Sequence, residues 1–187
     1  MTSQPQTRRR PRLETSAGVV LLVVLGFSLA LGALDAFRRR DELSPLLPGD
    51  VAPAFTLPRY AAAEKLSLES QRGRVVLLDF WATWCPPCLR ELPELGRLHD
   101  DLQARGFTVL AINREPEDRP KVEAYLRGRP FAFPVLFDTE NTGERYRVVS
   151  LPMTVLVDRN GRVVRQFMGY TEPDVMRAAV TQALDAP

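Results

Sequence analysis

The sequence has few residues that could build a metal site or a set of structural disulfides. Its 187 residues include two cysteines, Cys85 and Cys88, and one histidine, His99. A structural disulfide framework needs more cysteines spread along the chain, and a zinc or copper site needs further Cys or His ligands. Closing a loop of four residues also removes little chain entropy. We therefore predict no metal and no cofactor, a cysteine pair kept for its reactivity, and an exposed histidine on a helix.

Basic charge is also scarce over most of the chain. The first 40 residues hold seven arginines against Glu14 and Asp35, a net charge of +5. The whole chain carries +2, so residues 41–187 sum to −3. A nucleic-acid-binding domain carries its basic surface on the folded part. The composition therefore argues against nucleic acid as a partner.

Charged residues are absent from one stretch near the N-terminus, residues 15–34. As a helix, the apolar run 17–34 would span about 27 Å, and the hydrocarbon core of a bilayer is about 30 Å thick. A helix buried in a soluble core would normally keep a polar face. We therefore expect a transmembrane signal-anchor helix at 17–37 that contacts lipid, after a short basic tail at 1–16 and before a linker at 38–49.

Other targeting signals remain open for this N-terminal region. The length of the span and Arg38–Arg40 after it favour an uncleaved anchor, whereas a cleaved signal would need a shorter apolar core and a site such as Ala30–Gly32. Thr7–Arg9 hints at a twin-arginine signal, but Pro11 and Arg12 stand where such signals carry apolar residues. Four arginines precede the span and three follow it, so charge alone does not orient it.

The two cysteines follow an apolar run of strand length that begins at Val75, and the residues from Leu89 to Arg105 have the pattern of a helix. A buried strand thus delivers the pair to a helix N-terminus, where unpaired backbone N–H groups and the helix dipole stabilise a thiolate. This position lowers the thiol pKa and makes Cys85 the expected nucleophile. Cys88, one turn later, is the expected resolving thiol.

Trp84-Cys85-Pro86-Pro87-Cys88 after an apolar strand resembles the thioredoxin superfamily, and most of all its membrane-anchored TlpA/ResA/CcmG (DsbE) branch. The stretch 48–57 is similar to the start of TlpA-like proteins and peroxiredoxins. The resemblance implies an α/β, thioredoxin-like domain at 50–187. It would have a mixed central sheet with helices on both faces, an N-terminal strand extension and a helical insert at 119–133.

Alternating strand and helix patterns support that fold class. The expected elements outside the motif are a short edge strand within 48–57, a strand at 65–68, a strand at 107–112, a short helix at 121–127, an extended stretch at 133–138, a helix near 142–146, a hairpin of 154–158 with 163–167, and a last helix at 172–184.

Asp79 stands out as a carboxylate in an otherwise apolar strand. Burying it is costly unless it is neutral or paired, so a satisfied structural carboxylate is one interpretation. The resemblance implies another, in which Asp79 accepts the proton of Cys88 during resolution. Many TlpA-like proteins carry asparagine at this position.

Leu151-Pro152-Met153-Thr154 matches the cis-proline segment of the same superfamily. The resemblance implies that Pro152 packs against the disulfide and that the backbone of Leu151 pairs with an extended substrate. Trp84 would contact the substrate, and Pro86 and Pro87 would stiffen the loop between the sulfur atoms. An ordinary proline at the start of a strand is the alternative for Pro152.

The predicted function is that of an extracytoplasmic thiol–disulfide oxidoreductase that reduces disulfides of exported proteins. The resemblance implies a membrane electron donor of the CcdA or DsbD type and apocytochrome c as a common substrate. A disulfide-forming oxidase would use the same residues, and a thioredoxin-fold metal chaperone is a non-enzymatic alternative. A peroxiredoxin is disfavoured, because Leu78 and Ala82 stand where that family has proline and threonine.

Overall fold

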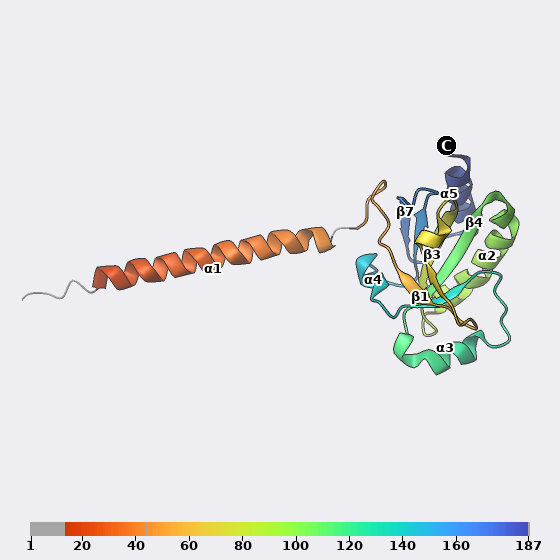
Figure 1. Ribbon diagram of the computed structural model, residues 1–187, viewed down its shortest axis with the longest axis horizontal. Coiled ribbons are helices and arrows are strands. Elements are labelled where there is room, and N and C mark those ends of the chain that lie inside the picture. Colours follow the sequence, from red (N-terminus) through yellow and green to blue (C-terminus); the bar gives the residue numbers. More distant parts are fainter. Residues whose placement is uncertain (1–13, 44, 187) are drawn as a thin grey trace, which may run out of the picture. The chain divides into compact units, whose positions relative to one another are not determined.

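One long helix accounts for the described part of the N-terminal unit. The computed structural model describes residues 14–43 and 45–186, and the chain divides after residue 44 into two units. Helix α1 runs from Glu14 to Leu43 (Figure 1). Its stretch Gly18–Asp35 has a mean hydropathy of 2.2 and is exposed, so α1 is long and apolar enough to cross a membrane, a test that a signal sequence also passes. Residues 1–13 of the expected basic tail at 1–16 lie outside the described residues.

Helix α1 is longer at both ends than the expected span. It includes residues 14–16 of the expected tail and residues 38–43 of the expected linker. Neither stretch contains proline or glycine, and the first proline after the span is Pro45. A helix usually ends at or before the residue that precedes a proline, which explains why the helix continues through the arginines and stops at Leu43.

The second unit, residues 45–187, is built on a five-stranded sheet. Its strands lie in the order β5-β4-β3-β6-β7. Strands β3, β4 and β5 are parallel, whereas β6 is antiparallel to β3 and β7 is antiparallel to β6. The strands are β3 (Val75–Trp81), β4 (Phe107–Asn113), β5 (Val135–Phe137), β6 (Met153–Val157) and β7 (Val163–Met168). The expected mixed sheet is confirmed.

A small antiparallel pair and several helices surround this sheet (Figure 1). The pair is β1 (Thr56–Pro58) and β2 (Lys65–Ser67). The α-helices are α2 (Pro86–Leu102), α3 (Arg119–Leu126), α4 (Thr142–Arg145) and α5 (Pro173–Asp185), and the 3-10 turns are η1 (Glu69–Gln71), η2 (Gln103–Arg105) and η3 (Pro116–Asp118). Helix α3 lies between β4 and β5, within the expected insert.

Side-chain alternation along β3 divides the core into two parts. Val75, Leu77 and Trp81 pack with buried residues of α2, α3 and α5. Val76 and its alternate neighbours pack on the opposite face with Leu57 of β1 and Tyr146. Successive residues of a strand point to opposite faces of the sheet, and this central strand is buried on both. Helices α2, α3 and α5 therefore cover one face, whereas β1 and Tyr146, the residue directly after α4, cover the other.

Local chemistry sets the ends of the elements next to the cysteine pair. Pro86 and Pro87 occupy the first positions of α2, where no backbone N–H is needed. At the other end, η2 closes on Gly106, which has a φ of 88°. Only glycine takes this left-handed conformation without a steric cost, and the chain turns there directly into β4.

The expected exposure of His99 is wrong. The side chain is buried with 5% of its surface accessible, and its ring lies near those of Phe107 and Phe133. Its Nδ1 accepts a hydrogen bond from the backbone N–H of Val109 at 3.4 Å. Burial lowers the pKa of His99 below its ordinary value, against the nearby Asp100 carboxylate, which raises it. His99 therefore packs α2 onto β4.

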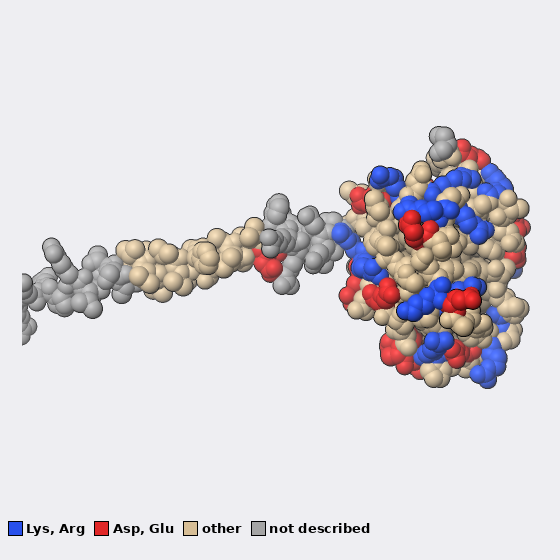
Figure 2. Space-filling model, in the orientation of Figure 1, with Lys and Arg blue, Asp and Glu red and all other residues tan. Residues whose placement is uncertain are grey.

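Charges of both signs are interspersed over the face of the second unit in view in Figure 2. Several arginines have a carboxylate partner. These pairs include Arg97–Glu94, Arg105–Asp185 and Arg177–Asp101. Part of the surface charge of the second unit is thus paired locally.

Candidate active site

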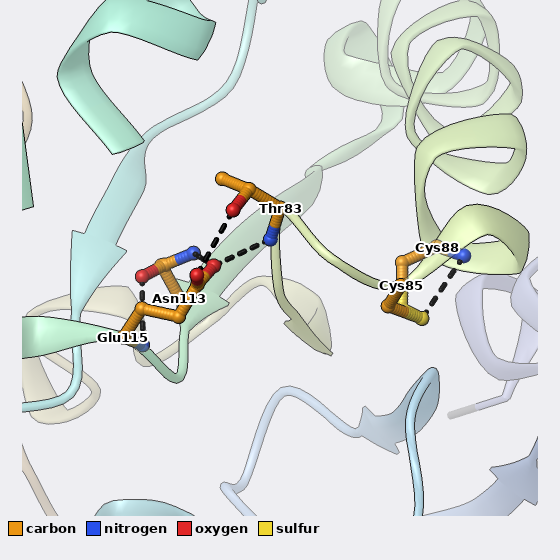
Figure 3. Close-up of a disulfide and its surroundings, with 5 residues drawn as sticks. All are labelled: Thr83, Cys85, Cys88, Asn113 and Glu115. Atoms are coloured by element: carbon orange, nitrogen blue, oxygen red, sulfur yellow. Dashed lines mark hydrogen bonds between the residues drawn. A yellow bond between two sulfur atoms is a disulfide. The ribbon is translucent and has the colours of Figure 1, made fainter. Parts of the chain in front are cut away.

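The two cysteines form a disulfide at the start of α2. The sulfur atoms of Cys85 and Cys88 are 2.00 Å apart, and only 3% and 1% of the two residues are exposed (Figure 3). Both belong to the buried cluster between the sheet and α2. The structure therefore contains the oxidised pair, with its surface largely covered by protein.

Cys85 is the N-cap residue of α2. Its backbone is extended, and its Sγ accepts a hydrogen bond from the backbone N–H of Cys88 at 3.3 Å. An N-cap atom lies where the first N–H groups of the helix point and where the dipole favours negative charge. The same position would stabilise a Cys85 thiolate after reduction. Because Cys88 lies inside the first turn, it is the more buried of the two.

The peptide bond between Leu151 and Pro152 is cis. Pro152 directly precedes β6, which pairs with β3, the strand that leads to the cysteines. Leu151 packs against both core clusters, including the one that contains the disulfide. Its backbone N–H and C=O make no hydrogen bond to another described residue. The backbone of Leu151 is thus available to an extended peptide.

Large apolar side chains are exposed on segments that flank this end of the sheet. Trp84, directly before Cys85, is 64% exposed, and Val149, just before Leu151, is 80% exposed. Met168, at the end of β7, is 70% exposed and is opposite Met153 in the strand register. Exposed apolar residues on several adjacent segments are typical of a surface that binds another protein. Pro86 is also exposed, and Pro87 is half-buried.

Asp79 lies on the α2 side of β3. By strand alternation it faces the same way as Leu77 and Trp81, both members of the cluster that contains the disulfide. It is 1% exposed, and neither carboxyl oxygen has a hydrogen-bond partner among the described residues. Burial raises the pKa of Asp79 well above its ordinary value, and the nearby Glu91 carboxyl raises it further. A satisfied structural carboxylate is therefore not what the structure contains.

Glu91 is a second buried carboxyl group next to Asp79. It lies on α2, three residues after Cys88, and is 2% exposed. Its Oε1 accepts a hydrogen bond from the backbone N–H of Thr171 at 3.3 Å, while Oε2 has no partner among the described residues. Burial raises the pKa of Glu91 to about 7, although the hydrogen bond from Thr171 lowers it.

A cavity connects Glu91 to the space between α2 and α5. It has a volume of about 130 Å³, and its lining includes Glu91, Thr171 and Met176. A polar cavity needs roughly 10–15 Å³ of such space for one water molecule, so water can reach the Glu91 carboxyl here. Glu91 therefore lies between the buried Asp79 and a polar opening.

Sequence reasoning missed two residues of this buried polar group, Glu91 and Thr154. Thr154 on β6 is opposite Asp79 in the register, and its hydroxyl also lacks a partner in the part of the chain that the structure describes. The available signal for Glu91 was its spacing, one helical turn after Cys88 on the buried face of α2. Thr154 gave no signal, because its partner strand is determined only by the fold.

Within the described residues, no group of three or more His, Cys, Asp or Glu side chains is placed to hold a metal ion. The chemistry available is that of a dithiol and two buried carboxyl groups. Thiol–disulfide exchange is the reaction that such a pair supports. The class of protein is therefore that of thioredoxin-like thiol–disulfide oxidoreductases.

Comparison with known proteins gives the same class and adds the family. The chain belongs to the AhpC/TSA family, whose model matches residues 48–166. It is similar to the thiol–disulfide oxidoreductase ResA of Geobacillus thermodenitrificans (strain NG80-2), with 34% identity over 159 residues, 84% of this chain and 88% of the relative. ResA of Bacillus subtilis (strain 168) is 29% identical over 163 residues, 87% of each chain.

A solved structure agrees with these relatives. The crystal structure of a putative thiol:disulfide interchange protein DsbE from Chlorobium tepidum is similar with a TM-score of 0.70 and 34% identity, over 74% of this chain and 99% of that chain. The expected thioredoxin-like fold and the expected thiol–disulfide oxidoreductase activity of the ResA and DsbE type are thus confirmed.

Proposed function

We propose that the protein is a membrane-anchored reductase that acts outside the cytoplasm on disulfides of exported proteins. The observation that carries this proposal is the placement of Cys85 as N-cap of α2, beside the cis-proline segment and an exposed apolar surface. Helix α1 is the proposed signal anchor, and the residues from 50 onward form the proposed catalytic domain. Residues 44–49 then form the remaining linker, because α1 includes residues 38–43.

The proposed reaction has two exchange steps. The Cys85 thiolate attacks a substrate disulfide, forms a mixed disulfide and releases one substrate thiolate. The Cys88 thiolate then attacks Sγ of Cys85, so that the second substrate thiol leaves and the Cys85–Cys88 disulfide forms. The substrate gains two electrons and the enzyme loses two. The oxidised pair seen in the structure is the product of this half-reaction.

Asp79 is the proposed proton acceptor for Cys88 in the second step. Proton transfer is efficient when the pKa values of donor and acceptor are close. An ordinary aspartate is far more acidic than a thiol, and burial raises the pKa of Asp79 toward the range of a thiol. The buried Glu91 and its polar cavity provide the route by which this proton reaches solvent.

Substrate binding is assigned to the surface around the disulfide. Trp84 supplies an apolar contact, and the free backbone of Leu151 pairs with an extended substrate strand. Pro152 covers the disulfide, and Pro86 and Pro87 stiffen the loop between the sulfur atoms. Apocytochrome c thiols are the proposed substrate, by resemblance to the branch of the family that includes ResA and DsbE.

A reductase that acts outside the cytoplasm requires a source of electrons. An oxidising compartment returns the dithiol to a disulfide, so each reduction of a substrate needs a new electron pair. A membrane thiol protein of the CcdA or DsbD type is the proposed donor, and α1 would hold the enzyme in the same membrane.

The decisive experiment uses the full-length protein in detergent. Dithiothreitol-dependent reduction of insulin disulfides tests for catalysis, and equilibration with glutathione gives the potential of the Cys85–Cys88 pair. A potential near the roughly −270 mV of thioredoxin fits a reductase, whereas a value near −120 mV assigns the protein as an oxidase. Absence of turnover in the wild type would contradict the enzymatic proposal.

A trapping experiment tests the roles of the two thiols separately. The Cys88→Ala variant lacks the resolving thiol and should accumulate a mixed disulfide with its natural partner on Cys85. The Cys85→Ala variant is the matched control and should trap nothing. If only the Cys85→Ala variant traps a partner, Cys88 is the nucleophile and the assignment is reversed.

A further inference from the structure

The loop between β3 and the nucleophile is held by a single carboxylate. Thr83, two residues before Cys85, donates two hydrogen bonds to the carboxylate of Glu115. One comes from the backbone N–H of Thr83 and the other from its hydroxyl, at 2.9 Å (Figure 3). Glu115 belongs to the segment after β4, 32 residues further along the chain. A long-range contact of this kind fixes the loop to the sheet at the point where the chain leaves β3 for the active site.

The segment that carries Glu115 is itself fixed. The backbone N–H of Glu115 donates to the side chain of Asn113 at 2.9 Å, and the amide nitrogen of Asn113 lies 3.5 Å from Oε2 of Glu115. The backbone N–H of Arg114 donates to the carbonyl of Trp81 at 2.9 Å. Glu115 is therefore a rigid acceptor, joined at several points to the ends of β3 and β4.

Lys121 connects the same carboxylate to α3. Its ammonium group donates to Oε1 of Glu115 at 2.9 Å and is half-exposed, whereas the Glu115 side chain is only 6% exposed. The ring of Tyr125, also on α3, lies 5.7 Å from that of Trp81 between ring centres. The insert thus contacts the end of β3 through the aromatic pair, and the segment after β4 through the ion pair.

Every acceptor position that Glu115 presents to its surroundings is in use. Oε1 accepts from the hydroxyl of Thr83 and from Lys121, and Oε2 accepts from the backbone N–H of Thr83 and faces Asn113. Burial raises the pKa of Glu115, but these hydrogen bonds outweigh burial and hold the pKa below its ordinary value. Glu115 is ionised at neutral pH and has no oxygen left for proton transfer with a cysteine.

We infer that Glu115 is a positioning residue for Cys85, which holds the Thr83 loop so that the nucleophile stays at the N-cap of α2, and that Lys121 makes the insert part of this support. The inference rests on the proposed role of Cys85 as the attacking thiol. It assigns to α3 a role in the reactivity of the pair. Thr83 is the residue that transmits the effect.

The variants separate a positional effect from an electrostatic one. Glu115→Gln keeps the size of the side chain but has one acceptor oxygen where the carboxylate has two. Thr83→Val removes only the hydroxyl, and Lys121→Met removes only the outer cation. Glu117→Gln is the matched control, because Glu117 is exposed on the same segment. All are made in the full-length protein.

The readout is the pH profile of Cys85 alkylation by iodoacetamide in the reduced protein. If Glu115 positions the loop, Glu115→Gln and Thr83→Val both move the midpoint of this profile upward, because Cys85 leaves the helix N-terminus for part of the time. In the double variant with both Glu115→Gln and Thr83→Val, the midpoint should shift no further than in the stronger single variant. Turnover on insulin should fall about tenfold, as small misplacements of a reacting group do, while Glu117→Gln matches the wild type.

Three results would overturn the inference. A downward shift in Glu115→Gln would mean that its charge, and not the position of the loop, acts on the thiol. A loss of thermal stability with an unchanged alkylation profile would leave Glu115 with a structural role only. Additive shifts in the double variant would mean that Thr83 does not transmit the effect.

Lys121→Met provides a test in a variant with little risk to folding, and its expected result is a smaller upward shift of the alkylation midpoint. Failure of the proposed function would differ from all of these, because the wild type itself would then show no turnover.

Discussion

Asp79 on β3 lies directly opposite Thr154 on β6, and neither side chain has a hydrogen-bond partner within residues 14–43 and 45–186. Opposite residues of an antiparallel pair have Cβ atoms about 5 Å apart. Buried polar groups without partners are rare and mark catalytic roles or bound water. The pair lies on the α2 side of the sheet, the side of the disulfide, where a proton must be taken up during resolution.

The Asp79→Asn variant should resolve its mixed disulfide more slowly and unfold less readily. In the wild type, the raised pKa of Asp79 means that the folded state binds the proton more tightly than the unfolded state. The stability of the wild type therefore falls as pH rises above the ordinary aspartate range. Asparagine removes this decline. The melting temperature at pH 7 should therefore increase, and the increase should shrink toward pH 4. Stopped-flow kinetics should give a rate of resolution that is about a tenth of the wild-type rate or lower.

The control for this prediction is Asp100→Asn, which changes an exposed aspartate of α2 that does not line the cavity beside Glu91. It should leave the rate of resolution unchanged. If Asp79→Asn also resolves at the wild-type rate, Asp79 is not the proton acceptor.

Glu91 should make the protein less stable as pH rises from about 4.5 to about 7. Its pKa is about 7 in the folded state against 4.5 as the ordinary value. The folded state therefore binds more protons than the unfolded state between these values, and stability falls by roughly 2–3 kcal/mol from pH 4.5 to pH 7. Urea unfolding of Glu91→Gln across this range should lack that decline. The same slope in variant and wild type would contradict the raised pKa.

His99 should have the opposite effect on stability. Burial lowers its pKa below 6.5, so the unfolded state binds the proton more readily than the folded state. The contribution of neutral His99 is then present above pH 6.5 and is lost as pH falls below it. A His99→Leu variant should keep the packing against Phe107 and Phe133 and lose this acid-side decline. Glu91 changes the stability in the opposite direction over part of this pH range. The stability of the double variant with Glu91→Gln and His99→Leu should therefore be compared with that of Glu91→Gln alone, so that only the contribution of the histidine differs.

The sequence predicts the central strand and the cysteine site because both are formed by residues that are neighbours in the chain. Val75–Trp81 is an apolar run that had to be a central strand, and the spacing of Cys85 and Cys88 alone indicates exchange chemistry. The match to a cis-proline segment led to Leu151-Pro152, whose bond is cis. In each case the relevant residues are neighbours in the chain.

Contacts between distant segments could not be predicted in this way. The burial of His99 depends on Phe107 and Phe133, and the role of Glu115 depends on Thr83, 32 residues earlier. The register that places Thr154 opposite Asp79 is fixed only when β6 pairs with β3. Helix α1 continues beyond the expected span to Leu43, because charged residues after an apolar span continue a helix as readily as apolar ones.

Trp84 should contribute to substrate binding and little to folding. It is 64% exposed directly before Cys85, so its removal leaves no cavity in the core. The Trp84→Ala variant should raise KM for insulin by about tenfold or more, as the loss of an exposed aromatic contact at an interface does, with kcat and melting temperature near the wild type. Leu47→Ala, at an equally exposed apolar residue near the start of the second unit, should leave KM unchanged. An unchanged KM in Trp84→Ala would mean that the substrate does not contact the tryptophan, and an equal rise in both variants would mean that the effect is not specific to it. A fall in kcat alone would place Trp84 in the chemical step.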